Sequence, residues 1–189
     1  SRYTNWLHTQ WPAGGVEKGP GVHDDGTTNL KGVRVVGDLT GVPLLKFSAD
    51  TGAKAVTEIL AESDFKPGAG NSTAVYDLVI VGAGVSGISA AIEAKKARLN
   101  FVIYEADESF ATIHNFPRKK PIFTYPTEMK NAGELHFEAD VKEALLIELK
   151  AQQAEHGIET TRAKVQHLRR TGGVLAVEFA KGESAKAQR

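Results

Sequence analysis

Six residues near the middle of the chain have the types and spacing needed to hold a phosphate group. They form a complete G-x-G-x-x-G motif, consisting of Gly82, Ala83, Gly84, Val85, Ser86 and Gly87. The first glycine allows a tight turn, the second lets the backbone approach a pyrophosphate, and the third lets a helix pack close to a strand. A helix that starts here would direct its free N–H groups and its positive dipole end at the phosphates.

The sequence on both sides of this motif is what a dinucleotide-binding unit requires. Residues Leu78–Val81 are a continuous apolar run, typical of a strand that is buried on both faces. A second apolar run, Phe101–Tyr104, ends at Glu105, which follows Gly82 by 23 positions. A carboxylate at that place accepts hydrogen bonds from ribose hydroxyls and repels a 2′-phosphate, so FAD or NAD is favoured over NADP. We therefore predict that Glu105 and the adjacent Ala106 join the glycine motif as cofactor-binding residues.

A second motif lies nearer the N-terminus. Residues Thr28–Asp38 have the sequence TNLKGVRVVGD, a turn followed by an apolar run that ends in Gly37 and Asp38. Tyr76–Asp107 resembles the opening FAD-binding unit of the two-dinucleotide-binding-domain flavoproteins, the pyridine-nucleotide-disulfide reductase and thioredoxin-reductase-like superfamily. The Thr28–Asp38 segment resembles the closing motif of the same superfamily.

This resemblance assigns roles to the second motif. In the superfamily, the aspartate of the closing motif binds the ribityl–pyrophosphate region of the flavin, which implies that Gly37 and Asp38 contact FAD. It also implies a following helix, at roughly Leu44–Glu62, whose first turn lies closest to the flavin ring. On this helix, one face would be formed by Leu44, Phe47, Thr51, Ala55 and Ile59.

The order of the two motifs is the reverse of the usual one, because Asp38 precedes Gly82 by 44 positions. The domain is either permuted, with Asp38 folding back onto one shared site, or residues 1–62 are the tail of one module and residues 76–189 begin another. A third interpretation makes Val33–Asp38 an ordinary strand with Asp38 capping the next turn. Residues 63–75 are a linker by composition. We favour the single shared site.

The segment after Glu105 contains a long irregular stretch at Ser109–Glu134, which carries three prolines. Long ordered loops in compact domains are often functional. In related flavoproteins the corresponding region runs beside the flavin ring, which implies four candidate ring neighbours: Asn115, Phe116, Thr124 and Tyr125. The basic run at residues 118–120 is a candidate anion contact, but short basic runs are usually solvated surface, which is the favoured interpretation. Arg98 stands where relatives often place a helix-ending glycine, so Asn100 is expected to take the left-handed conformation instead.

The C-terminal part predicts a helix and a hairpin. Ala139–His156 is amphipathic, with Asp140 as a candidate N-cap and Gly157 as its end. Thr160–Leu168 and Val174–Phe179 are expected to be strands joined by a glycine-containing turn. In the superfamily such a meander leads into a further strand, and the chain stops at Arg189 where that strand would begin.

Composition excludes several kinds of function. The 23 basic and 23 acidic residues cancel, so bulk charge does not predict nucleic-acid binding. No run approaches the length of a membrane span, and the six histidines have no metal-ligand spacing. The chain contains no cysteine, so it cannot itself exchange a dithiol for a disulfide. Low cysteine use favours a reducing compartment, and the cytoplasm is the predicted location.

The sequence therefore predicts an α/β fold: an incomplete Rossmann-like three-layer domain with a parallel sheet and an antiparallel β-meander. The resemblance implies the FAD-binding portion of a flavin-dependent oxidoreductase, similar to NAD(P)H-dependent reductases. Such a portion would need an NAD(P)H-binding domain or an electron-transfer partner from elsewhere. The alternatives are an NAD(H)-binding domain and a non-catalytic nucleotide-binding or docking module. No residue is assigned a catalytic role.

Overall fold

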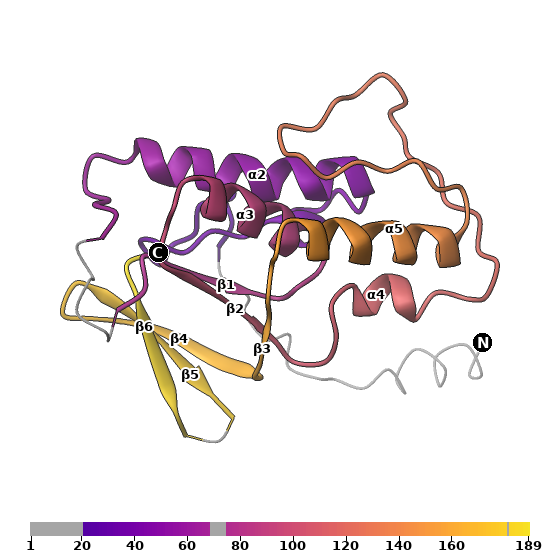
Figure 1. The fold of residues 1–189 in the computed structure, drawn as a ribbon. Helices are drawn as coiled ribbons and strands as arrows, with labels where there is room; N and C mark the ends of the chain where they lie inside the picture. The colour runs from indigo at the N-terminus through magenta and orange to yellow at the C-terminus, as the bar shows by residue number, and fades with distance from the viewer. Residues whose placement is uncertain (1–20, 69–74, 181) are drawn as a thin grey trace, which may run out of the picture.

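The structure is a computed structural model that describes residues 21–68, 75–180 and 182–189. The first 20 residues of the predicted segment 1–62, and residues 69–74 of the predicted linker, lie outside the described residues. Figure 1 shows three layers, with helices above a parallel sheet and a second, antiparallel sheet below it. The predicted fold class is confirmed.

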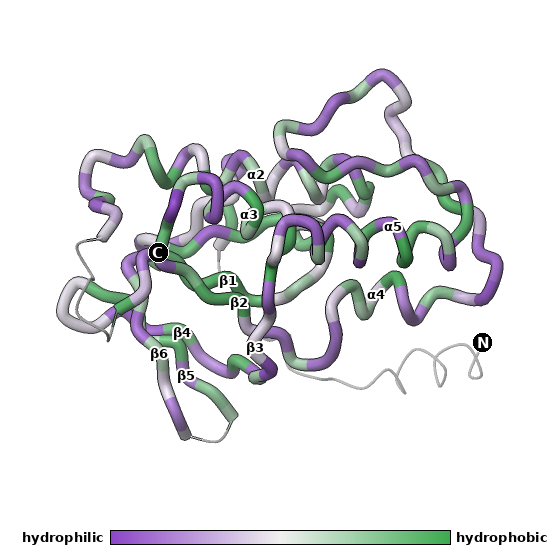
Figure 2. The backbone as a smooth tube through the Cα atoms, viewed as in Figure 1, coloured by the Kyte–Doolittle hydropathy of each residue, from purple (hydrophilic) through white to green (hydrophobic). Residues whose placement is uncertain are grey.

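A β-α-β unit forms the centre of the molecule. Strand β1 (Leu78–Val81) leads through the glycine motif into helix α3 (Val85–Lys96), and the chain returns as β2 (Phe101–Glu105). Strands β1 and β2 are parallel, with Leu78 opposite Phe101. The short β3 (Thr161–Arg162) continues the sheet beside β2, also in parallel. Both long strands are apolar because the helix layer covers one face and the antiparallel sheet the other (Figure 2).

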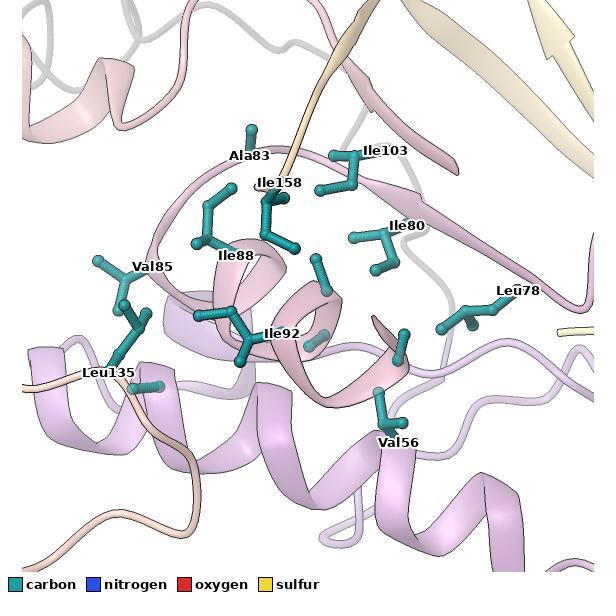
Figure 3. Packing of buried hydrophobic residues seen from close by; sticks show 14 of the residues in the cluster. Val56, Leu78, Ile80, Ala83, Val85, Ile88, Ile92, Ile103, Leu135 and Ile158 are labelled. Carbon is teal, nitrogen blue, oxygen red and sulfur yellow. The ribbon is translucent and has the colours of Figure 1, made fainter. Parts of the chain in front are cut away.

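The core lies between this sheet and the helices. The largest fully buried side chains include Ile88 and Ile92 of α3 and Ile103 of β2. Figure 3 shows Ile80 of β1 and Val56 of the next helix layer pointing into the same cluster. Ile80 and Ile103 face the helix side, so the strands beside the glycine motif are fixed by packing against the helices.

Helix α2 (Leu45–Ala61) confirms the helix predicted at Leu44–Glu62, but the five residues predicted to share one face are not its buried face. Four of its five residues are only half-buried, and Ile59 alone is fully buried. The buried face is instead made of small side chains and two larger ones: Ser48, Ala49, Asp50, Gly52, Ala53, Val56 and Ile59. Small residues let α2 approach α3 closely, a packing requirement that hydrophobicity alone does not reveal.

The apolar run Val33–Asp38 does not form the predicted strand. Only Arg34 makes an isolated bridge, to Thr27, and the run ends in the short 3₁₀ helix η1 (Gly37–Thr40). The Thr28 hydroxyl donates to the carbonyl oxygens of Leu30 and Val33 at 3.1 and 3.0 Å, which curls the start of the run. Residues 33–36 are extended but have no neighbouring strand among the described residues.

The remaining helices are α4 (Ala111–His114), inside the predicted irregular stretch, and α5 (Lys142–Glu155). Helix α5 confirms the predicted amphipathic helix, but Asp140 is not its N-cap. Val141 holds that position without a side-chain cap. After α3, Arg98 itself has a φ of 57°, so the prediction that Asn100 would take the left-handed conformation was wrong.

The antiparallel sheet is a meander of β4 (Val165–Thr171), β5 (Val174–Phe179) and β6 (Ser184–Ala187), in that order. Gly172 and Gly173 form the β4–β5 turn with φ angles of 58° and 88°, as a two-residue hairpin requires. The strand predicted at Thr160–Leu168 is divided, because its first part joins the parallel sheet as β3 and its second part is β4.

Candidate nucleotide-binding site

The glycine motif forms a tight turn that leaves open space in front of it. Gly82 has a φ of 97°, and its N–H donates to the Tyr104 carbonyl oxygen at 2.8 Å. A Cβ added at Gly82 or Gly84 would have no neighbour within 4 Å, whereas a Cβ at Gly87 would overlap the Gly82 carbonyl oxygen. The first two glycines therefore face a free volume, and the third allows α3 to sit directly against the turn.

Helix α3 begins at this turn without a side-chain cap. Gly84 is its N-cap residue, and no side chain bonds to the first N–H groups. Uncapped amides at a helix N-terminus carry a partial positive charge and point away from the helix. The turn and the helix end thus present backbone donors to the same space in front of Gly84.

Glu105 closes the turn from the side. One carboxylate oxygen accepts from the Ala83 N–H at 2.7 Å, and the other accepts from the Asp107 N–H at 2.9 Å. The Ala83 side chain is buried, and Ala106 is exposed beside the turn. Glu105 therefore holds the motif in shape, while each of its oxygens keeps a lone pair for another donor.

The Gly37–Asp38 motif lies against the glycine motif. Gly37 has a φ of 74°, and a Cβ added there would be 2.5 Å from the Ser86 hydroxyl oxygen. The Gly37 N–H donates to the Thr51 hydroxyl at 2.9 Å, and the Ser48 hydroxyl donates to the Asp38 carboxylate at 2.5 Å. Helix α2 thus carries the two side chains that hold the Gly37–Asp38 turn in place.

One cavity of about 790 Å³ contains residues from both motifs. Six predicted site residues line it: Asp38, Gly82, Gly84, Val85, Ser86 and Gly87. Four others lie next to it without lining it: Gly37, Ala83, Glu105 and Ala106. The reversed order of the motifs in the sequence does not separate them in space.

The irregular stretch after β2 supplies another wall of the cavity. Of the four predicted ring neighbours, Phe116 and Tyr125 line the cavity, whereas Asn115 and Thr124 do not. Sequence reasoning missed Lys120, which lines the cavity with its ammonium group 3.6 Å from the Phe116 ring centroid. The signal for it was the basic run, whose three members are all exposed and whose other two lie outside the cavity.

Helix α2 also anchors this wall. The Lys46 ammonium group donates to the carbonyl oxygens of Pro126 and Thr127, each at 2.9 Å. Phe123 and Tyr125, just before this anchor, are exposed and stacked, with ring centroids 6.1 Å apart. An apolar, aromatic rim therefore stands above the first turn of α2.

Tyr104 lies on β2, directly before Glu105. Burial, chiefly, raises the pKa of Tyr104, and the neighbouring Tyr76 raises it further. The Tyr104 phenol therefore stays neutral at physiological pH. No group of three or more potential metal ligands occurs in the part of the chain that the structure describes. Within the same residues, no helix has the length and apolar character needed to cross a membrane.

Comparison with known proteins identifies relatives of part of the chain. Residues 79–168 match the family described as pyridine nucleotide-disulphide oxidoreductase, a match that begins in β1 and includes the glycine motif. The superfamily resemblance is confirmed. The matched oxidoreductase-like segment does not include residues 28–38, so the closing motif rests on its own residues and on its position in the structure. No curated protein sequence matches the chain.

Solved structures share the fold of about three fifths of this chain. A flavin-containing monooxygenase from Stenotrophomonas maltophilia gives a TM-score of 0.53 at 20% identity, over 61% of this chain and 37% of that chain. The bacillithiol disulfide reductase Bdr from Staphylococcus aureus gives 0.51 at 18% identity, over 61% and 37%. Bdr from Bacillus cereus gives 0.51 at 18% identity, over 60% and 38%. The chain thus spans little more than a third of the length of these proteins.

Proposed function

We propose that this chain is the FAD-binding part of a flavin-dependent oxidoreductase. The observation that carries the proposal is that Asp38 and the Gly82–Gly87 turn line one cavity, although they are far apart in the sequence. Each motif alone is weak evidence for a dinucleotide site. Two motifs with different roles in binding the same cofactor, brought together by the fold, are much more specific.

The shape of the site fits a dinucleotide. The space that a Cβ at Gly82 or Gly84 would occupy is free, as a pyrophosphate lying on the backbone requires. The cavity volume of about 790 Å³ falls within the range of about 300–1,000 Å³ that is usual for cofactor pockets. In this arrangement the first amides of α3 bind the pyrophosphate, and Glu105 binds the adenosine ribose.

The other wall would bind the flavin half. Asp38 is held by Ser48 with one carboxylate oxygen, so its second oxygen is available to a ribityl hydroxyl. The aromatic and apolar side chains of Phe116, Phe123 and Tyr125 offer a surface on which a large planar ring can lie. A bound flavin would supply the electron-transfer chemistry, and these residues would position it and exclude water.

A ring-sized apolar surface beside Asp38 favours FAD over NAD(H). The chain has no cysteine. A redox-active cysteine pair, whether as substrate or as an internal disulfide relay, would therefore have to belong to a different polypeptide segment. The hydride donor or electron acceptor is accordingly proposed to come from an NAD(P)H-binding domain or a partner protein. A docking module without chemistry is the alternative that a colourless, nucleotide-free protein would support.

Titration of the purified chain with FAD, and separately with NADH, tests the proposal. We expect FAD to bind with quenching of its fluorescence and a shift of its visible absorbance. Asp38→Ala should weaken FAD binding by about ten- to a hundredfold, the range for losing a charged hydrogen-bond acceptor. Asp24→Ala is the matched control, because Asp24 is exposed and lies outside the cavity.

Two results would contradict the proposal. Equal FAD affinity of Asp38→Ala and the unchanged chain would remove the closing motif from the site. Binding of NADH but not of FAD would assign the glycine motif to a nicotinamide cofactor instead.

A further inference from the structure

The wall of the cavity contains a positive charge that the proposed function does not use. Four charged side chains line the cavity within the part of the chain that the structure describes: Arg34, Asp38, Lys120 and Arg189. Arg34 and Arg189 both pair with Glu62, at 3.1 and 2.6 Å. Asp38 is assigned to the ribityl chain of FAD. Lys120 is left with no assigned role, and it forms no ion pair with any described residue.

The backbone around Lys120 is held by the residues at the start of α5. The Lys142 N–H donates to the Lys120 carbonyl oxygen at 3.0 Å. Two residues further along, the Ile122 N–H donates to the Asp140 carbonyl oxygen at 2.8 Å. These two bonds tie the irregular segment to α5 on the C-terminal side of Lys120. The lysine side chain therefore extends from a fixed point of the cavity wall.

The side chain of Lys120 is held at the same wall by an aromatic ring. Its ammonium group lies 3.6 Å from the centroid of the Phe116 ring, and both residues line the cavity together with Tyr125. A cation over the face of a ring is attracted by the negative charge density of that face. Phe116 and Tyr125 belong to the surface to which the proposed function assigns the flavin ring. The ammonium group is thus a neighbour of the ring rather than of the pyrophosphate at Gly84.

We propose that Lys120 raises the reduction potential of a flavin bound in this cavity, an inference that rests on the proposed function. An oxidised isoalloxazine ring is neutral, whereas uptake of two electrons and one proton leaves it with one negative charge. The electrons would come from the NAD(P)H-binding domain or partner protein proposed above. A cation fixed beside the ring stabilises the charged, reduced form more than the neutral, oxidised form, and so it favours reduction.

Redox titration of the FAD-loaded chain tests the proposal. Dithionite reduces the bound FAD together with a reference dye, and the two absorbances give the midpoint potential. Lys120→Met should weaken the binding of reduced FAD relative to oxidised FAD by about five- to tenfold. This effect is modest because Lys120 is exposed, and water screens its charge. For a two-electron couple, the same change lowers the midpoint potential by about 20–30 mV.

Matched variants separate the charge of Lys120 from its packing. Lys120→Arg keeps the charge and should preserve most of the potential. Lys119→Met removes the same charge from an exposed neighbour that lies outside the cavity, so it should leave the potential unchanged. The difference between Lys120→Met and the unchanged chain should shrink in about 1 M salt, because screening then acts over roughly 3 Å.

Four outcomes would overturn the proposal. Equal midpoint potentials of Lys120→Met and the unchanged chain would remove Lys120 from the surroundings of the ring and leave the proposed function intact. An equal loss of affinity for oxidised and reduced FAD would place the ammonium group on the phosphates. A difference in potential that persists in 1 M salt would indicate altered packing. If the unchanged chain binds no FAD, the proposed function itself is wrong, and this inference falls with it.

Discussion

The two walls of the cavity are positioned in different ways. The Gly82–Gly87 turn is fixed by its own β-α-β unit, since β1 precedes it, α3 follows it and β2 bonds to Gly82. The Gly37–Asp38 turn has no strand beside it within the part of the chain that the structure describes, and it is held from α2, by Thr51 and Ser48. One wall thus follows from local sequence, whereas the other depends on how α2 packs against α3.

The contact between these helices is therefore the structural link between the two walls. A Cβ added at Gly52 of α2 would overlap the Ser86 carbonyl oxygen of α3 and would lie 3.1 Å from its Cα. Ser86 also lies beside Gly37. A single residue of the glycine motif thus touches both α2 and the closing turn, so small changes at this contact should affect both walls together.

The largest effect is expected from Gly52→Val. The added side chain has no room against the α3 backbone, so the helices must separate, and overpacking of this kind costs roughly 3 kcal/mol or more of unfolding free energy. Urea denaturation measures the loss. Ala55→Val is the control, because Ala55 faces the cavity on the same helix. Equal stability losses in the two variants would show that the helix contact does not link the walls.

Gly84→Val should separate binding from stability. Nothing in the protein occupies the space in front of Gly84, so the expected cost is only that of a poor N-cap, about 1 kcal/mol. The β-branched side chain would fill the space assigned to the pyrophosphate, and nucleotide binding should become undetectable in a titration. Undiminished affinity would show that the pyrophosphate does not lie on this turn.

Glu105→Ala should moderately lower both the nucleotide affinity and the stability of the chain. Nucleotide affinity should fall by about 1–3 kcal/mol, because ribose hydroxyls lose a charged acceptor. The chain should also become less stable without nucleotide, since the Ala83 and Asp107 amides lose their partner. Calorimetric titration and thermal unfolding measure the two effects. Glu105→Gln, which keeps one acceptor oxygen, should lie between; affinity equal to that of the unchanged chain would remove Glu105 from the site.

The smallest effect is expected from Glu134→Gln, which is remote from both turns. The hydrogen bond from Lys96 is the main cause that lowers the pKa of Glu134. The Glu134–Lys96 interaction therefore stabilises the folded chain above the unfolded Glu134 pKa near 4.5, and this stabilisation is lost as pH falls through the lower folded pKa. Both side chains are about half exposed, so the difference at neutral pH should be under about 0.5 kcal/mol. Denaturation should show this difference in unfolding free energy at pH 7 and not at pH 3. Nucleotide affinity should be unchanged.

The difference between a wall fixed by local sequence and a wall fixed by helix packing also explains which features the sequence could predict. The strand, turn and helix around Gly82 were predicted because apolar runs and glycine spacing are local signals. The buried face of α2 was not predicted. Its residues Ala49, Gly52 and Ala53 are small, which allows close approach to α3, and they give no strong hydrophobic signal. The Val33–Asp38 run looked like a strand, and no local signal shows that it lacks a neighbouring strand to pair with.

The candidate site residues show the same contrast between local signals and features that depend on packing. The glycines and Asp38 could be proposed as site residues because their types occur at the spacings of known motifs, and most of them line the cavity. Lys120 was missed, because its place in the cavity depends on the path of an irregular segment that carries no periodic pattern. The division of Thr160–Leu168 between two sheets was missed for a related reason, since the alternation of side chains is the same on either side of the break.

The hydrogen bond from Ala83 to Glu105 has a consequence for the kinetics of association. A carboxylate of the chain itself already holds the Gly82–Gly87 turn in its curved form, so a nucleotide arriving at the proposed site would meet a turn that is already shaped. The entropy of shaping the turn is then lost during folding and not again at each encounter, which leaves diffusion and desolvation to set the association rate.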